Sequence, residues 1–171
     1  MKGYVHIYTG NGKGKTTAGL GLALRAAGAG IRVYIGQFVK SGSYCELKSL
    51  KKLKDMIKIE QYGRGCLIKG RPKGKDIELA RKGLARARKS LTCRRYGVVI
   101  LDEINTAVGL KLLDLRDVFS LVKTRPKNVE LILTGRRARP EIIKAADLVT
   151  EMKEIKHYYK KGVKARRGIE Y

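Results

Sequence analysis

A glycine-rich run near the start of the chain carries residue types that bind phosphate. Residues 10–17 read Gly-Asn-Gly-Lys-Gly-Lys-Thr-Thr, after a β-branched and aromatic stretch and before an apolar helical pattern. Glycines allow successive backbone N–H groups to face one anion, and the helix start adds the positive end of its dipole. Lys15 adds a charge, and the Thr16 hydroxyl is placed to bind Mg²⁺. The run predicts a P-loop, with Thr9 standing where the strict motif has glycine.

A pair of carboxylates follows an apolar run further along the chain. Residues 98–101 read Val-Val-Ile-Leu and lead directly into Asp102 and Glu103. Strands of this kind deliver acids to the edge of a parallel sheet where ligands bind. A purely structural glycine turn and a helix cap are the alternative readings of the two motifs. We expect metal ligation by Thr16, Asp102 and Glu103, and catalytic roles for Lys15, Thr16 and Glu103. The residues expected to bind nucleotide are Gly10, Asn11, Gly12, Lys13, Gly14, Lys15, Thr16 and Thr17.

The elements that must position these residues alternate between strand and helix patterns. The expected strands are 4–9, 32–38, 57–62, 98–101, 129–134 and 148–152. The expected helices are 16–27, 46–54, 76–91, 114–125 and 140–146. This alternation predicts an α/β fold with an open, mainly parallel sheet and helices on both faces. With 171 residues, the chain is expected to form a single domain, 1–171.

Composition excludes several other classes of protein. The 39 lysines and arginines exceed the 15 acids by 24 charges, yet 43% of residues are hydrophobic, which excludes a disordered basic tail protein. Cys45, Cys66 and Cys93 lack metal-site spacing and are expected to be free buried thiols. With only His6 and His157, a histidine-based metal site or catalytic triad is not expected. The sequence has no run long enough to span a membrane and no signal peptide, which predicts a cytoplasmic protein.

Taken together and in order, the motifs resemble those of the P-loop ATP:corrinoid adenosyltransferases. The matching segments are 9–17, 37–40, 101–103, 125–126, 134–136, 146–147, 156–157 and 168–171. The resemblance implies a three-layer, RecA-like P-loop NTPase fold, usually a homodimer, that acts in cobalamin biosynthesis or salvage. It also implies transfer of the 5′-deoxyadenosyl group of ATP to the Co(I) ion of a reduced corrinoid, with Mg²⁺ present and tripolyphosphate released. Since Co(I) is itself the nucleophile, this chemistry needs no general base.

The resemblance also suggests where the corrinoid lies, with one departure. Cys66 and Ile68 stand where many members of the family carry large aromatic rings. Some relatives cover the site with an N-terminal extension, and this chain begins at its first strand, so we expect the mobile loop 63–75 to act as the lid. Arg136 is either a ligand contact or part of a solvated basic turn. The corrinoid side is expected to involve Gln37, Phe38, Tyr62, Leu67, Ile68 and Arg136.

Co(I) requires an electron donor, and the chain shows no flavin or iron–sulfur motif. An external donor such as an acidic flavodoxin or ferredoxin is therefore expected to dock on the basic surface. The main alternative function is a RecA-like nucleic-acid-dependent ATPase, with basic segments such as 81–89 following phosphates. Only 6% of residues are aromatic and no DNA-binding module is recognisable, so nucleic acid is not expected as a partner. A small-molecule kinase and a non-enzymatic binding module are the remaining alternatives.

Overall fold

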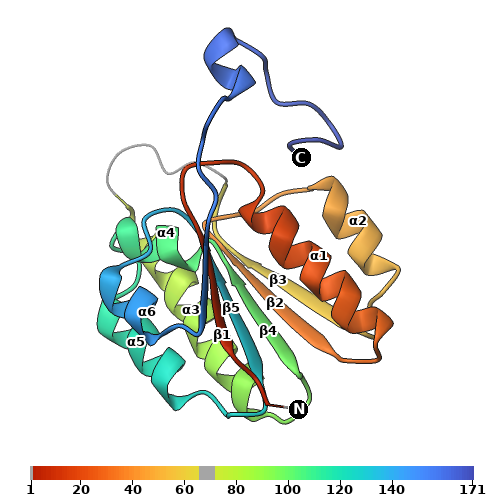
Figure 1. Cartoon of the computed structure of the whole chain (residues 1–171), viewed down its shortest axis with the longest axis vertical. Coiled ribbons are helices and arrows are strands. Elements are labelled where there is room, and N and C mark those ends of the chain that lie inside the picture. Colours follow the sequence, from red (N-terminus) through yellow and green to blue (C-terminus); the bar gives the residue numbers. More distant parts are fainter. Residues whose placement is uncertain (1, 66–71) are drawn as a thin grey trace.

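A single sheet of six parallel strands organises the described part of the chain, in a computed structural model that describes residues 2–65 and 72–171 (Figure 1). The strand order is β3-β2-β4-β5-β1-β6, and every pairing is parallel. The parallel sheet expected from the alternating pattern is confirmed. The strands are β1 (Val5–Thr9), β2 (Val33–Phe38), β3 (Ile57–Tyr62), β4 (Val98–Asp102), β5 (Glu130–Thr134) and β6 (Leu148–Glu151).

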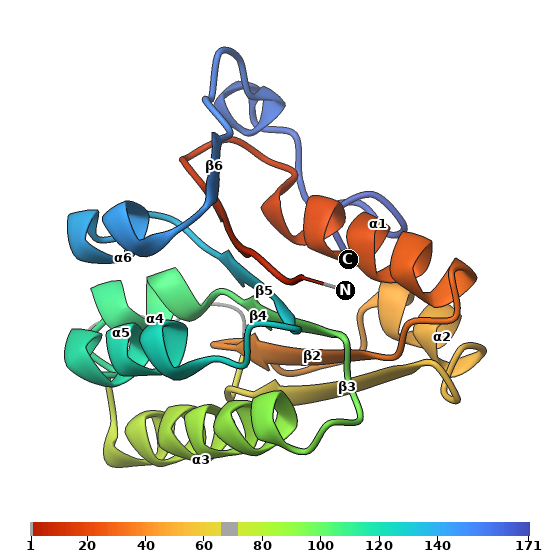
Figure 2. The ribbon, with the colours of Figure 1, turned by 60° about the horizontal axis from the view of Figure 1, so that its bottom comes forward.

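Helices cover both faces of this sheet and make three layers. Figure 2 shows α1 and α2 on one face and α3, α4, α5 and α6 on the other. The α-helices are α1 (Lys15–Gly28), α2 (Cys45–Lys51), α3 (Gly74–Thr92), α4 (Ile104–Gly109), α5 (Leu115–Thr124) and α6 (Pro140–Ala145), and a short 3₁₀ helix, η1, spans Tyr158–Lys161. In the described residues, no helix has the length and apolar character needed to cross a membrane.

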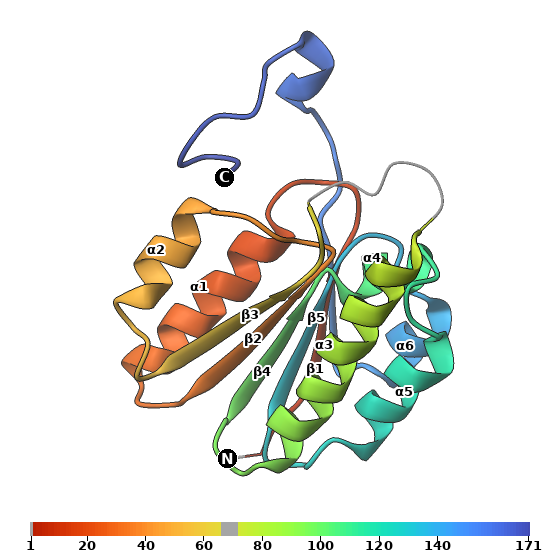
Figure 3. The same ribbon diagram turned by 180° about the vertical axis from the view of Figure 1, so that it is seen from behind.

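The uninterrupted apolar runs of the central strands follow from this double cover. Along β4, Val99 and Leu101 pack into the core beneath α3, α4 and α5, whereas Val98 and Ile100 pack beneath α1 and α2. The view from behind shows both helical layers on either side of the strands (Figure 3). A strand buried on both faces needs apolar residues at every position rather than at alternate ones. All parallel strands then end at one edge, where the P-loop begins.

Several local expectations differ from the structure. At helical spacing, Leu20, Ala23, Leu24 and Ala27 of the expected helix 16–27 would all lie on one face that packs on the sheet, but Leu24 is 59% exposed. Ala23 is buried and Leu20 and Ala27 pack against the same core, as expected, so only Leu24 departs from the expected face. Helix α4 was not expected, because its six residues directly follow a strand and are too few to show a helical period.

Of the expectation that the cysteines are free buried thiols, the structure confirms that Cys45 and Cys93 are free, but the expected burial is wrong. Cys93 is exposed and Cys45 is only partly buried. Cys93 directly follows the last residue of α3 and Cys45 is the first residue of α2, and helix ends are more open to solvent than helix middles. Cys66, like the corrinoid-side candidates Leu67 and Ile68, lies outside the described residues, as do residues 66–71 of the expected lid 63–75. The last two residues of that expected lid belong to α3, which begins at Gly74.

Candidate active site

The glycine run forms a tight loop between β1 and α1 because neighbouring backbone leaves no room for side chains. Gly10 and Gly14 have φ angles of 97° and 116°, in the left-handed region that glycine tolerates. A Cβ atom at Gly10 or Gly12 would lie 2.4 or 2.7 Å from the Met152 carbonyl oxygen. The Gly12 N–H donates to that oxygen at 2.7 Å. The loop is therefore shaped by the chain that follows β6 as well as by its own glycines.

Thr9, the departure from the strict P-loop motif, has a contact of its own. The Thr9 hydroxyl accepts a hydrogen bond from the Ala138 N–H at 3.2 Å. It thus links the end of β1 to the turn that precedes α6. The Thr9 side chain therefore helps to hold the start of the P-loop in place, at a position where the strict motif has glycine and no side chain.

Lys15 is the buried cation of the loop. Its side chain folds back so that Nζ donates to the Gly12 carbonyl oxygen at 2.6 Å, and the residue is only 6% exposed. Burial lowers the pKa of the Lys15 ammonium, and the Glu103 carboxylate opposes that shift. An ammonium held in poorly solvated surroundings interacts more strongly with an anion than a solvated one does. Lys15 is thus placed to stabilise a polyanion in the loop.

A buried carboxylate at the end of β4 gathers four donors, and we call this group the Asp102 cluster. Asp102 is 2% exposed. It accepts hydrogen bonds from Thr16 Oγ1 at 3.0 Å, Thr134 Oγ1 at 2.6 Å, Lys40 Nζ at 2.8 Å and Gln37 Nε2 at 3.2 Å. Thr16 belongs to the P-loop, so the hydroxyl and carboxylate expected near a metal do lie together. These oxygens suit a hard cation such as Mg²⁺.

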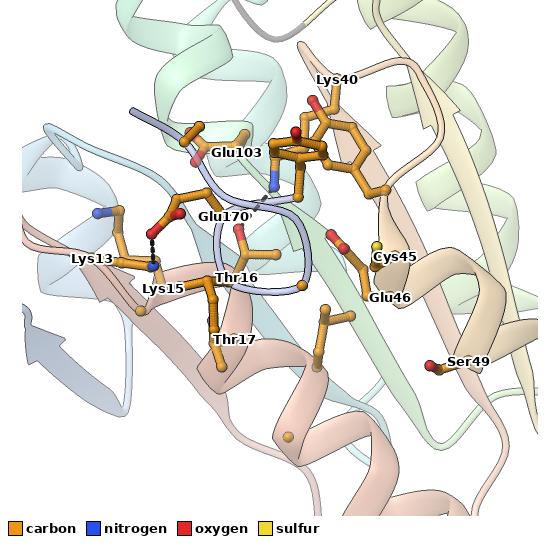
Figure 4. Close-up of a pocket in the computed structure, with 18 of the residues that line it drawn as sticks. Lys13, Lys15, Thr16, Thr17, Lys40, Cys45, Glu46, Ser49, Glu103 and Glu170 are labelled. Carbon is orange, nitrogen blue, oxygen red and sulfur yellow. Dashed lines mark hydrogen bonds and ion pairs between the residues drawn. The ribbon is translucent and has the colours of Figure 1, made fainter. Parts of the chain in front are cut away.

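Glu103 has a different set of contacts from Asp102. Its φ of 62° is unusual for a residue with a side chain, and its backbone N–H donates to Thr134 Oγ1 at 2.9 Å. The Glu103 carboxylate accepts a hydrogen bond from the Thr106 hydroxyl and faces the pocket (Figure 4). The structure therefore joins Thr16 directly to Asp102 and leaves Glu103 on the adjoining wall. Arg136 lines the same pocket, with its backbone N–H on Thr106 Oγ1 at 3.2 Å.

A segment far along the chain closes over the outer side of the P-loop. Glu170 accepts from Lys13 Nζ at 2.7 Å, and Lys13 also donates to the Tyr158 hydroxyl at 2.8 Å. Tyr158 donates to Glu170, and the Arg166 guanidinium lies 4.9 Å from the centroid of the Tyr158 ring. We call these four residues the Glu170 cluster. Hydrogen bonds, above all from Lys13, hold the pKa of the Glu170 carboxyl well below its usual range.

Sequence reasoning missed this cluster and the place of Lys40. The motif matches at 37–40 and 168–171 drew attention to both segments, yet nothing in them says what Lys40 and Glu170 touch. Lys13 and Glu170 are 157 positions apart, and Lys40 and Asp102 are 62 apart. Contacts of that range are set by the fold rather than by a local pattern.

The P-loop opens into a pocket of about 910 Å³. Loop residues, Lys40 and Glu103 line its polar end, and the tail segment that carries Glu170 covers it (Figure 4). Apolar side chains of α1, α2 and the turn after α2 line the rest, among them Leu20, Leu50 and Leu53. A site with one polyanion-binding end and one apolar end suits a nucleotide triphosphate or a similarly amphipathic molecule.

Three residues expected beside the corrinoid do not line this pocket. Gln37 and Phe38 are fully buried, because β2 lies between β3 and β4 and beneath α3. The Tyr62 ring packs on Phe38 with centroids 5.9 Å apart. Its hydroxyl donates to Glu60 at 2.7 Å, and burial above all raises the pKa of Tyr62 to about 12. These side chains support the wall of the site rather than present a surface to a ligand.

The sheet order, the glycine loop at the end of β1 and the buried acid at the end of β4 define a P-loop nucleotide-binding protein of RecA-like fold. The family model described as ATP:corrinoid adenosyltransferase BtuR/CobO/CobP matches residues 1–171. The chain therefore belongs to the ATP:corrinoid adenosyltransferase family.

Relatives that bear the family's name align with almost the whole chain. A corrinoid adenosyltransferase of Pseudomonas aeruginosa is 34% identical over 171 residues, covering 99% of this chain and 84% of the relative. One from a Sinorhizobium species is 34% identical over 173 residues, covering 99% and 81%. One from Escherichia coli is 32% identical over 170 residues, covering 99% and 86%.

Proposed function

We propose that this protein transfers the 5′-deoxyadenosyl group of ATP to the Co(I) ion of a reduced corrinoid and releases tripolyphosphate. In that reaction a Co–C5′ bond forms, the C5′–O bond breaks, and the bonding electron pair leaves on the triphosphate oxygen. The observation that carries the proposal is the pairing of a buried Lys15 with a glycine loop at the polar end of a large pocket. Such a site stabilises the charge that grows on a departing polyphosphate.

In this proposal the residues of the site have different roles. Lys15 and the backbone N–H groups of residues 10–17 hold the triphosphate, and fixing its position aligns C5′ for attack. Thr16 and Asp102 would hold Mg²⁺, with Glu103 on the adjoining wall as a further candidate. The ion, when bound, would neutralise part of the phosphate charge. Arg136 lies on the pocket wall, where it can contact phosphate or corrinoid.

Product analysis tests the proposal directly. ATP is incubated with the protein and a chemically reduced corrinoid without oxygen, and the phosphate product is identified by chromatography. We expect tripolyphosphate together with a light-sensitive Co–C bond. Orthophosphate and ADP, with the corrinoid left unalkylated, would overturn the proposal, and stimulation of that hydrolysis by DNA would favour the ATPase alternative.

We also infer a homodimer, supported by the exposed edge of the sheet. Among the described residues, strand β6 pairs with β1 alone, and its Leu148 and Val149 are both more than 40% exposed. Apolar side chains on an unpaired edge invite pairing with a second chain. Sedimentation of the protein at micromolar concentration tests this, and a monomer mass at all concentrations would contradict it. The single domain over 1–171 and the cytoplasmic location stay predictions.

An external electron donor completes the proposed reaction. The net charge of +24 supports docking of an acidic flavodoxin or ferredoxin, because opposite charges speed encounter. Salt screens such attraction within about 10 Å at 0.1 M ionic strength. The rate coupled to the donor should therefore fall with added salt, whereas the rate with a chemical reductant should not. Equal responses would argue against charge-guided docking.

A further inference from the structure

Lys40 is held over the metal-binding oxygens by the backbone that precedes it. Val39, the residue after β2, has a φ of 64°, which is costly for a β-branched side chain. Gly63 fits against this bend, since a Cβ atom there would lie 2.4 Å from the Val39 carbonyl carbon and 2.6 Å from the Lys40 nitrogen. Near this bend, Gln61 Nε2 of β3 donates a hydrogen bond to Gln37 Oε1 of β2 at 3.1 Å. A bend of this cost, fixed from a second strand, aims the Lys40 side chain.

The Lys40 ammonium contacts the two groups that are best suited to hold Mg²⁺. Its Nζ donates to Thr16 Oγ1 at 2.9 Å and to Asp102 Oδ2 at 2.8 Å. Its side chain is 16% exposed and that of Asp102 is 3% exposed. Since Thr16 donates its own proton to Asp102, its hydroxyl has both a donor and an acceptor contact already in use. The positive charge of the ammonium, held against both oxygens, repels a second cation that approaches them.

We propose that Lys40 is a tethered cation that competes with the divalent metal for Thr16 and Asp102, so that the metal is held tightly only once a nucleotide draws Lys40 away. The proposal rests on the proposed binding of a nucleotide triphosphate to the P-loop, and it does not depend on the corrinoid reaction. In the nucleotide-free protein Lys40 balances the buried charge of Asp102. Tight binding of the metal therefore requires bound nucleotide, so the two bind together.

The pocket beside Lys40 contains groups that can keep contact with its ammonium when it leaves Asp102. Lys40, Tyr44 and Glu46 all line the cavity that opens from the P-loop. While bound to Asp102, the Lys40 Nζ already lies 6.0 Å from the centroid of the Tyr44 ring, at the limit of a cation–π contact, so the ring lies beside the ammonium. A triphosphate in the loop adds negative charge on the same side. The ammonium can therefore leave Asp102 without entering an unfavourable environment.

Binding of Mn²⁺, followed by electron paramagnetic resonance without any corrinoid, tests the proposal. Lys40→Met keeps the length of the side chain and removes its charge. In the nucleotide-free protein we expect this variant to bind Mn²⁺ about tenfold more tightly than the wild type, since a nearby positive charge is gone. With ATP bound, the difference should shrink to about twofold or less, because the wild-type lysine has then moved. Unchanged or weaker Mn²⁺ binding by the nucleotide-free variant would overturn the proposal.

Matched variants separate competition from a structural role. Lys51→Met removes a charge from the exposed side of α2 and should leave Mn²⁺ affinity within about twofold of the wild type. Lys40→Arg keeps the charge and should keep Mn²⁺ binding weak. Lys40→Gln replaces Lys40→Met should the latter fail to fold. Tight Mn²⁺ binding by Lys40→Arg would count against competition by charge.

A melting experiment gives an independent readout. A ligand that binds only the folded protein raises Tm according to its affinity. Added Mg²⁺ should therefore raise the Tm of Lys40→Met more than that of the wild type, and equal shifts would contradict the proposal. These measurements do not depend on which phosphate product forms. Failure of the product analysis would refute the adenosyl transfer and leave the metal result standing.

Discussion

The two sides of the P-loop are held by ion pairs of opposite character. On the inner side Lys40 pairs with Asp102, and their side chains are 16% and 3% exposed. On the outer side Lys13 pairs with Glu170, at 40% and 19%. The first pair belongs to a buried network that reaches three strands of the sheet, whereas the second joins the loop to a surface segment. Exposed pairs add little to stability, while breaking a buried one leaves an uncompensated charge.

This contrast suggests different tasks for the two sides. Thr16, Thr134 and Gln37 hold the Asp102 carboxylate in place at the inner side, whereas the Glu170 cluster sets where the covering segment lies. Variants on the inner side should therefore change the rate and the stability strongly, whereas those on the outer side should change mainly the position of the covering segment and affect the rate less. Four experiments can break or sharpen this division.

The largest effect on the reaction rate is expected from substitution of the buried Lys15. Lys15→Ala should lower the adenosylation rate about 10²-fold or more, by analogy with loss of one preorganised donor to a developing anion. Lys13→Ala, on the outer side, should cost less than about tenfold, because its charge is solvated. The rate is followed by the absorbance of the alkylated corrinoid at saturating ATP. Equal losses in the two variants would remove the distinction.

Stability should show the next largest difference. Asp102→Ala removes the acceptor that Lys40, Thr16, Thr134 and Gln37 share and should lower the free energy of unfolding by about 3 kcal/mol. Glu170→Ala should leave the urea midpoint where it is in the wild type. Urea titration followed by circular dichroism measures both. A larger loss in the Glu170 variant would reverse the proposed roles.

Salt should loosen the outer side alone. Raising NaCl from about 50 mM to about 500 mM shortens the screening length severalfold, so trypsin should cut within residues 157–171 about threefold faster. Glu170→Gln should already be cut at that faster rate in low salt and should respond little to more. Mass spectrometry of the released peptides gives the rates. A wild-type rate insensitive to salt would show that the ion pair does not hold the segment.

The smallest effect is expected from pH. The pKa of Glu170 is lowered from 4.5, so its contact is complete above pH 4.5 and is lost only as pH falls through the lower value. The pKa of Lys13 is raised above 10.5, chiefly by Glu170, so its contribution is complete below pH 10.5. Hydrogen exchange at residues 158–162, corrected for the chemical rate, should thus change less than about twofold between pH 6 and pH 9. A transition inside that range would mean that another group controls the segment.

Local chemistry was visible in the sequence, and its partners were not. The glycine run predicted the P-loop and the Val-Val-Ile-Leu-Asp-Glu segment predicted β4, because each signal is contained within a few consecutive residues. The structure places this loop and this strand side by side. The positions of Phe38 and Tyr62 were harder, since a buried aromatic and a ligand-binding one look alike in sequence. Lys40 looked like one of 39 basic residues until the bend at Val39 placed it on Asp102.

The hydrogen bonds around Met152 make the loop and the covering segment one mechanical unit. The Gly12 N–H donates to the Met152 carbonyl, and the Met152 N–H donates to Thr9 at 2.9 Å, so the start of the loop is clamped to the chain that leaves β6. A shift of the loop toward an incoming anion must pull that chain along with it. The P-loop and the chain that follows Met152 would then move together, so that anion binding in the loop would also bring the covering segment closer to the ligand.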